Sequence, residues 1–272
     1  MSEPGRACLR PPSVCAGLTA LATMTRYEVI GVAGIGEVRR GDDIARLIVE
    51  AATRQSTPVI ANDLLVIGQK IVSKAEGRLV RLADVQPSPI ALAMAAGLAK
   101  DPHLVEVILS ESRRVVRMDK GVLITETHHG WICANAGVDQ SNVDADYVAL
   151  LPVDSDRSAR AVRDRVRALT GADVFVIISD TFGRPWREGL TNIAIGLAGF
   201  APLLSYLGER DPAGRPLQAT ILALADELAG AAELVMGKLD RIPAALVRGL
   251  TLKPSEEGSK PLLREPARDL FR

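Results

Sequence analysis

The stretch "VIISDTFGRPWREG", residues 176–189, decides the fold and points to a functional site. The apolar residues 174–178 are typical of a buried strand, which we expect to stop at Ser179, Asp180 and Thr181. A loop rich in glycine and arginine follows. A carboxylate and a hydroxyl at the end of a strand are oxygen ligands on a rigid element, a common way to bind Mg²⁺ or Mn²⁺. An ordinary Asp-initiated turn or helix cap gives the same local pattern, so both interpretations stay open at this point.

A second polar cluster follows another expected strand, in "CANAGVDQSN", residues 133–142. Asn135, Asp139, Ser141 and Asn142 place oxygen-bearing side chains around Gly137. A divalent cation site competes here with a plain Asx-rich turn. Two such clusters in one chain favour the metal site, because Mg²⁺ bound to phosphates needs only one or two protein carboxylates.

A third cluster is basic and lies in "GQKIVSKAEGR", residues 68–78, where Lys70, Lys74 and Arg78 leave an expected strand. Such cations suit phosphate or carboxylate recognition, although a solvated basic edge would look the same. The chain has no P-loop motif, and the glycines of "GVAGIG", residues 31–36, lack the dinucleotide-binding spacing. They still allow backbone N–H groups to approach a ligand. Together, the three clusters indicate a metal-dependent enzyme acting on an anionic substrate.

Composition excludes several other classes of protein. The 272 residues carry a formal net charge of zero and only 3% aromatic residues, which argues against a nucleic-acid surface. No apolar run approaches the roughly 20 residues that span a bilayer. The three cysteines share no metal-ligand spacing, and Cys133 is expected in the core. We therefore expect a cytoplasmic protein with neither nucleic acid nor membrane as a partner.

Alternating strand and helix patterns predict a mixed α+β fold. Helix starts are expected at Asp42 or Asp43, at Ser88 and at Asp101, with another helix ending at Gly171. Residues 1–23 are interpreted as a disordered leader or a start called too early. We expect one domain over 24–250, with 24–80 and 171–250 forming one subdomain and 81–170 inserted between them. Residues 251–272 are expected to be a tail lying loosely on the surface.

Five motifs along the chain, taken together, resemble the coenzyme F420-0:L-glutamate ligase family. They are "GIGEVRRGDD", "QKIVSKAEGR", "HGWICANAGVDQSN", "VIISDTFGRPWREG" and "ELVMGK", and the resemblance runs from Tyr27 to Leu250. It implies a mixed-sheet, two-part fold that forms an intertwined homodimer. It also implies an enzyme that uses GTP to add L-glutamate to the terminal carboxylate of F420-0, and further γ-linked glutamates in some members. The implied route is an acyl phosphate, with release of GDP and phosphate.

The resemblance also assigns roles to residues. Asp139 and Asp180 match the metal-binding aspartates, Thr181 matches a ligand of a second metal, and Lys74 joins the aspartates as a catalytic residue. Mg²⁺ or Mn²⁺ is implied, with two ions per site, and K⁺ is a further candidate. The positions that match GTP contacts are Ile35, Gly36, Glu37, Val38, Gln69, Lys74, Asn142, Met236, Gly237 and Lys238.

Residues 184–187 carry two arginines and a tryptophan, and they are expected either to meet a planar anionic substrate beside the metal or to brace their loop. Three departures from the family pattern bear on the second metal and the substrate. "GIGE" replaces "GIPE", "REGLTN" replaces "REGQTD" through Leu190 and Asn192, and Lys238 stands where some relatives have glutamine. Two alternatives remain. One is a GTP-dependent ligase or kinase acting on a different carboxylate, and the other is a non-catalytic deazaflavin-binding relative.

Overall fold

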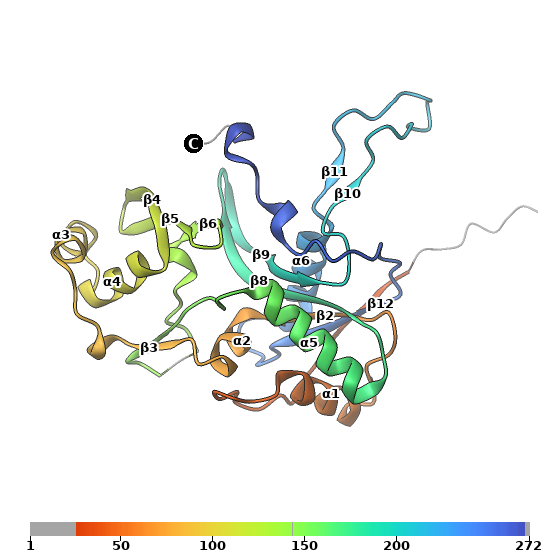
Figure 1. Ribbon diagram of the computed structural model, residues 1–272, viewed down its shortest axis with the longest axis horizontal. Coiled ribbons are helices and arrows are strands. Elements are labelled where there is room, and N and C mark those ends of the chain that lie inside the picture. The colour runs from red at the N-terminus through yellow and green to blue at the C-terminus, as the bar shows by residue number, and fades with distance from the viewer. Residues whose placement is uncertain (1–25, 143, 270–272) are drawn as a thin grey trace, which may run out of the picture.

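A five-stranded mixed sheet forms the centre of the computed structural model, which describes residues 26–142 and 144–269 (Figure 1). The strand order is β1–β12–β2–β8–β9, and only β2 and β8 run parallel. The mixed α and β class is therefore confirmed, whereas the leader at 1–23 lies outside the described residues. The strands are β1 (Glu28–Gly31), β2 (Leu64–Gly68), β8 (Phe175–Arg184), β9 (Arg187–Ala198) and β12 (Ala244–Arg248).

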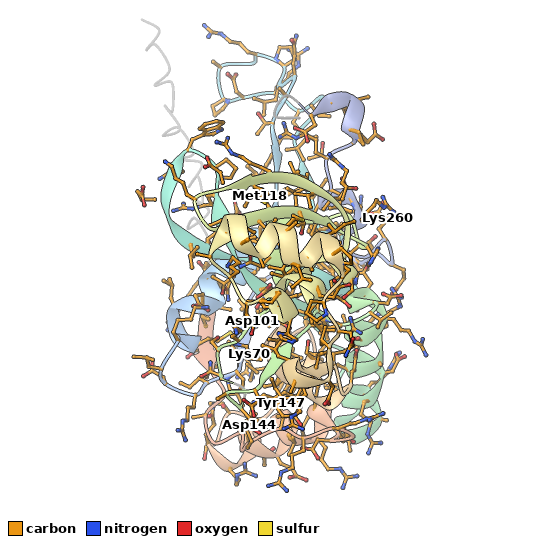
Figure 2. All side chains as sticks on the ribbon, turned by 90° about the vertical axis from the view of Figure 1, so that its left-hand side faces the viewer. Lys70, Asp101, Met118, Asp144, Tyr147 and Lys260 are labelled. Carbon is orange, nitrogen blue, oxygen red and sulfur yellow. The ribbon has the colours of Figure 1, made fainter. Side chains whose placement is uncertain are left out.

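A second region lies to the left of the sheet in Figure 1 and faces the viewer in Figure 2. It has its own apolar core, in which Ile108 and Leu123 are fully buried. The division of the chain at residues 81 and 171 stays a prediction. The region's elements are β3 (Leu79–Arg81), α3 (Pro89–Leu98), α4 (Pro102–Ser110), β4 (Ser112–Asp119), β5 (Val122–Thr127), β6 (Ile132–Ala134) and β7 (Tyr147–Ala149).

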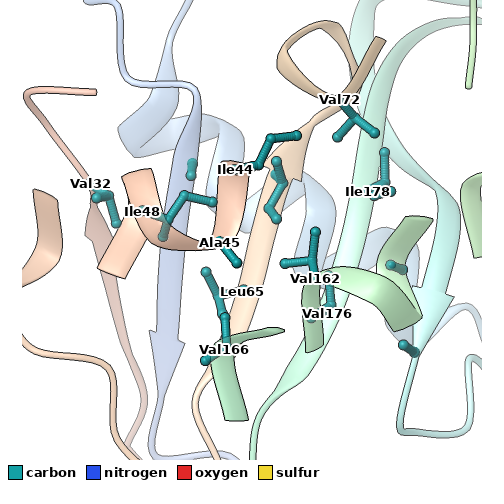
Figure 3. Close-up of a cluster of buried hydrophobic side chains, with 14 of the residues drawn as sticks. Val32, Ile44, Ala45, Ile48, Leu65, Val72, Val162, Val166, Val176 and Ile178 are labelled. Atoms are coloured by element: carbon teal, nitrogen blue, oxygen red, sulfur yellow. The ribbon is translucent and has the colours of Figure 1, made fainter. Parts of the chain in front are cut away.

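Helices cover both faces of the central sheet. Leu65 and Ile67 of β2 pack in one cluster with α1 (Ile44–Arg54), α2 (Gln69–Ala75) and α5 (Ser155–Thr170) (Figure 3). Leu64 and Val66 belong to the cluster on the other face, against α6 (Leu224–Met236). A strand buried on both faces needs apolar residues at successive positions, which explains the continuous run in β2.

The predicted helix starts are confirmed by side-chain capping. Asp43 accepts a hydrogen bond from the Arg46 backbone N–H, and Ser88 and Asp101 cap α3 and α4 in the same way. Such a bond satisfies one of the backbone donors that a helix start leaves unpaired. Gly171 ends α5 with φ +75°, a left-handed conformation that glycine adopts without steric cost.

The expectation that the strand stops at Ser179 is wrong. β8 continues to Arg184 and pairs with β9 in a long hairpin, so Asp180 lies opposite Ile193 within the ladder. A polar edge ladder of this kind carries no apolar signal in the sequence, because one side of it faces water.

The C-terminal segment is anchored rather than loose over its described part. Leu252 is buried, and the Ser259 backbone N–H donates to the Asp156 carboxylate of α5. An arm formed by β10 (Leu204–Ser205) and β11 (Ile221–Leu222) projects away from the sheet (Figure 1). No helix in the described part of the chain is long and apolar enough to cross a membrane. The 3₁₀ turns are η1 (Leu82–Asp84), η2 (Asn135–Gly137), η3 (Lys260–Leu262) and η4 (Pro266–Arg268).

Candidate functional site

The predicted metal-binding residues lie where the two parallel strands separate. Gly68, the last residue of β2, lies opposite Ser179, and the chain then turns directly into α2. β8 continues alone on that side and carries Asp180 and Thr181 beyond the parallel pairing. Ligands of open α/β sheets bind outside the carboxyl ends of parallel strands, where neighbouring chain segments diverge. The sheet topology thus exposes these residues at one place.

Asp139 forms the first half of the site and is held through both its backbone and its carboxylate. Its backbone exchanges hydrogen bonds with Ala149 of β7, and its carboxylate accepts the Ser141 backbone N–H at 2.6 Å. The Lys70 ammonium lies 2.7 Å from Asp139 Oδ2 and donates to Ser141 Oγ at 2.6 Å. Burial opposes ionisation of Asp139, but the Lys70 contact and the Ser141 N–H outweigh it and lower the pKa. Asp139 is therefore a preformed anion.

Asp180 forms the second half and has the opposite character. Burial raises the pKa of this half-buried carboxyl to about 6, the negative charge of Asp139 pushes the same way, and the Thr181 N–H and two lysines oppose them. Among the described residues, no Lys, Arg or His nitrogen lies within 4.0 Å of its carboxylate. Two neighbouring aspartates, one of them lacking a close cation, are a donor set that fits one divalent metal ion.

Cys133 is a buried neighbour of Asp180. The thiol is buried in the main core, and burial, together with the negative charge of Asp180, raises its pKa to about 12. The expectation of a core cysteine is thereby confirmed, because such a thiol stays protonated and unreactive at neutral pH. Nearby in the sequence, the Asn135 side-chain oxygen is buried without a hydrogen-bond partner among the described residues.

Thr181 belongs to a closed ring of four polar side chains. Its hydroxyl donates to Asn192 Oδ1 at 2.7 Å and accepts from Lys238 Nζ at 2.5 Å. Asn192 Nδ2 donates to Glu233 Oε2 at 2.7 Å, and Lys238 lies 3.2 Å from Glu233 Oε1. Glu233 is the member of the site that sequence reasoning did not assign, and Lys70 was expected only as one cation of a basic cluster. Both lie in motifs that were recognised, but their partners are distant in sequence.

Lys74, a predicted nucleotide contact, is a buried residue of α2. Its side chain is 9% exposed and forms an ion pair with Glu37, another predicted GTP position. A solvated basic edge is therefore the wrong description of this lysine. Ile35 and Val38 point into the core, while the position of a side chain at Gly36 would be open. The loop thus offers a ligand its backbone at Gly36 and the carboxylate of Glu37.

The other predicted nucleotide positions are more dispersed. Gln69 is buried and accepts a hydrogen bond from Ser73 within α2. Met236 is buried at the end of α6, and a side-chain carbon placed on Gly68 would lie 3.6 Å from its terminal methyl group. The loop that begins with Gly237 and Lys238 therefore starts beside the β2–α2 junction. Asn142 lies in an exposed turn with φ +55°. The roles of all these residues stay predictions.

The two arginines and the tryptophan of the opening stretch lie at the tip of the β8–β9 hairpin. Arg184 donates to the Glu188 carbonyl across the turn at 2.6 Å, which supports the bracing interpretation. Trp186 is 85% exposed, with φ +66°. Because a strand rises about 3.3 Å per residue, Arg184 lies roughly 13 Å beyond Asp180. The hairpin tip thus lies away from Asp180 along β8, and the role of these side chains toward a substrate stays a prediction.

Comparison with known proteins identifies the family of the chain. A family profile described as F420-0:gamma-glutamyl ligase matches residues 34–249, a span that contains both aspartates and Lys74. The chain belongs to this ligase family. The coenzyme F420:L-glutamate ligase of Methanothermobacter thermautotrophicus is 47% identical over 248 residues, covering 90% of this chain and 98% of that protein.

Two further relatives of the ligase family carry the same name. The protein from Methanopyrus kandleri is 49% identical over 243 residues, or 87% of this chain and 94% of that protein. The protein from Archaeoglobus fulgidus is 39% identical over 249 residues, or 91% and 97%. The resemblance drawn from the five motifs is thus confirmed.

Proposed function

We propose that this chain is a GTP-dependent ligase that joins L-glutamate to the terminal carboxylate of coenzyme F420-0. The observation that carries the proposal is the pair Asp139, in the turn that pairs with β7, and Asp180 of β8, with the ammonium group of Lys70 on Asp139. Lys74, one turn further along α2, is paired with Glu37. The names of the relatives supply the substrates, and the site supplies a place for phosphate chemistry. Further γ-linked additions would use the same groups.

The proposed reaction has two steps. The F420-0 carboxylate attacks the γ-phosphorus of GTP, so that an acyl phosphate forms and GDP leaves. The amine of glutamate then attacks the acyl carbon, forming the amide and releasing phosphate. Repulsion between the triphosphate and an incoming carboxylate is the main obstacle to the first step, which makes fixed positive charge the principal requirement of the site.

The chain's own residues meet this requirement in distinct ways. Asp139 and Asp180 would hold Mg²⁺ or Mn²⁺, which when bound supplies positive charge to the phosphate oxygens. Lys74 is positioned by Glu37 beside the open backbone at Gly36, and it supplies a point charge for a phosphate group. Lys70 neutralises Asp139 in the free protein, so an arriving cation must share or replace that contact.

We further propose that the ligase works as a homodimer in the cytoplasm. Support for the dimer comes from large apolar side chains on two projecting segments. Trp186 and Leu190 are exposed on the β8–β9 hairpin, and Leu207 and Ile221 are exposed on the β10–β11 arm (Figure 1). Apolar surface of this kind marks protein–protein contacts. Light scattering of the purified chain tests the dimer.

The test of the function is GDP release measured with each substrate omitted in turn. We expect release to require GTP, a divalent metal and F420-0, with full turnover only when L-glutamate is present. A ligase or kinase for a different carboxylate would give no F420-0-dependent release. A non-catalytic deazaflavin-binding relative would bind F420-0 without releasing GDP. Either result would overturn the proposal.

A further inference from the structure

The ammonium group of Lys238 contacts Thr181, the residue that follows the metal-binding candidate Asp180. The group lies 2.5 Å from Thr181 Oγ1 and 3.2 Å from Glu233 Oε1. These contacts join Thr181 of β8 to the last turn of α6 and the loop after it. The side chain keeps 59% of its surface exposed, so its charge faces the open side of the site.

The oxygens around Lys238 are those that a second cation would use. A hydroxyl, a carboxylate and an amide oxygen converge from β8, α6 and β9. The ammonium already contacts the hydroxyl of Thr181 and the carboxylate of Glu233, and the amide oxygen of Asn192 accepts from the same hydroxyl. A divalent ion on Thr181 Oγ1 would meet this fixed positive charge at close range, which disfavours its binding. The residues present therefore do not fit a second metal.

We propose that Lys238 is the second cation of the site, and that the ligase binds a single divalent ion, at Asp139 and Asp180. The inference rests on the proposed function and specifies how its charge is supplied. Lys238 acts as a tethered monovalent charge that Thr181 and Glu233 aim at the anionic ligands. An ammonium group of this kind needs no metal from solution and cannot dissociate.

The hydrogen-bond ring explains why Asn192 accompanies this lysine. Asn192 accepts from Thr181 and donates to Glu233, so it aligns both partners of Lys238 without adding negative charge. An acidic residue at this position would add a charge that favours a divalent cation. Asn192 and Lys238 thus act as a pair. Asn192 is a positioning residue, whereas Lys238 supplies positive charge to the ligands and Asp139 and Asp180 hold the metal.

The test is the number of Mn²⁺ ions bound per chain, measured by equilibrium dialysis in the presence of GDP. We expect one ion for the natural protein and two for Lys238→Gln, which removes the charge and offers an amide oxygen. Electron paramagnetic resonance gives an independent readout, because two adjacent Mn²⁺ ions broaden each other's signal and one ion does not. Lys260→Gln, at an exposed lysine set apart from Lys70 in Figure 2, is the control and should bind one ion.

Two ions, or none, in the natural protein would overturn the inference, as would a single ion in Lys238→Gln. Thermal melting of each variant shows whether the exposed substitution leaves the fold intact. Formation of glutamylated F420-0 by the same preparation is measured separately. Product formed together with two bound ions would refute the role of Lys238 and leave the proposed function standing. Absence of product from a natural protein that binds one ion would refute the function instead.

Discussion

Replacing Asp180 by asparagine should stabilise the metal-free protein while abolishing its activity. The pKa of this carboxyl rises from 3.8 to about 6, chiefly through burial. Each pKa unit corresponds to about 1.4 kcal/mol, so the ionised carboxylate costs the folded state up to about 3 kcal/mol. Because the side chain is only half-buried, contact with water reduces this figure. Asparagine has the same shape and no charge, so it avoids the cost.

The pH dependence follows from the direction of the shift. A carboxyl with a raised pKa holds its proton more tightly in the folded state than in the unfolded state. The cost of ionisation is therefore absent below about pH 4, grows between about pH 4 and 6, and is complete above about pH 6. Asp180→Asn should then add up to about 3 kcal/mol at pH 8 and little at pH 4.

Urea denaturation at the two pH values, with a chelator present, measures the effect. Asp164→Asn, at an exposed aspartate on α5, is the matched control and should change the free energy of unfolding by less than about 0.5 kcal/mol. An equal effect of Asp180→Asn at pH 4 and pH 8 would refute the raised pKa of this carboxyl. Saturating Mn²⁺ should reverse the order of stability, because the natural protein binds the ion and the variant binds it poorly.

Three further predictions concern the metal, the nucleotide and the fold. Asp139→Ala should lower the rate of ligation at least ~10²-fold, and combining it with Asp180→Ala should lower the rate little further, because both residues serve one cluster. Steady-state rates measure this, and losses that add in the double variant would decide against a shared site. Lys74→Met should weaken both GTP binding and turnover, while the melting temperature without nucleotide stays nearly unchanged. If GTP and Mn²⁺ raised the melting temperature of the variant as much as that of the natural protein, Lys74 would lie outside the nucleotide site. Gly196→Ala should destabilise the fold by about 1–3 kcal/mol, since its new methyl group would lie 2.4 Å from the Ser155 carbonyl oxygen; an unchanged urea midpoint would contradict this packing.

Local chemistry predicted much of the fold. Helix starts at Asp43, Ser88 and Asp101 could be recognised because a side-chain cap is a contact between residues two or three positions apart. The strand expected before Lys70 is β2, and its continuous apolar run reflects burial on both faces. The extension of β8 to Arg184 could not be recognised, because its pairing with β9 depends on a partner strand and not on its own residues.

The site was predicted residue by residue, but its contacts were not. Asp139 and Asp180 stood out as carboxylates that follow apolar strands. The ion pairs of Lys74 with Glu37 and of Lys70 with Asp139 join residues far apart in the sequence, so only the folded chain shows which charges neutralise each other. The same holds for Lys238, whose partner Thr181 lies on another element. Spacing along the chain cannot report such contacts.

The central claim, ligation of glutamate to F420-0 at the paired aspartates, is tested most directly by mass spectrometry of F420-0 after incubation. The reaction contains the natural protein, GTP, Mn²⁺ and L-glutamate, and Asp180→Ala serves as the matched inactive variant. The account predicts that the natural protein converts F420-0 to a species heavier by one glutamyl residue, and that Asp180→Ala leaves it unchanged. Unmodified F420-0 with the natural protein, or equal conversion by a folded Asp180→Ala variant, would contradict it.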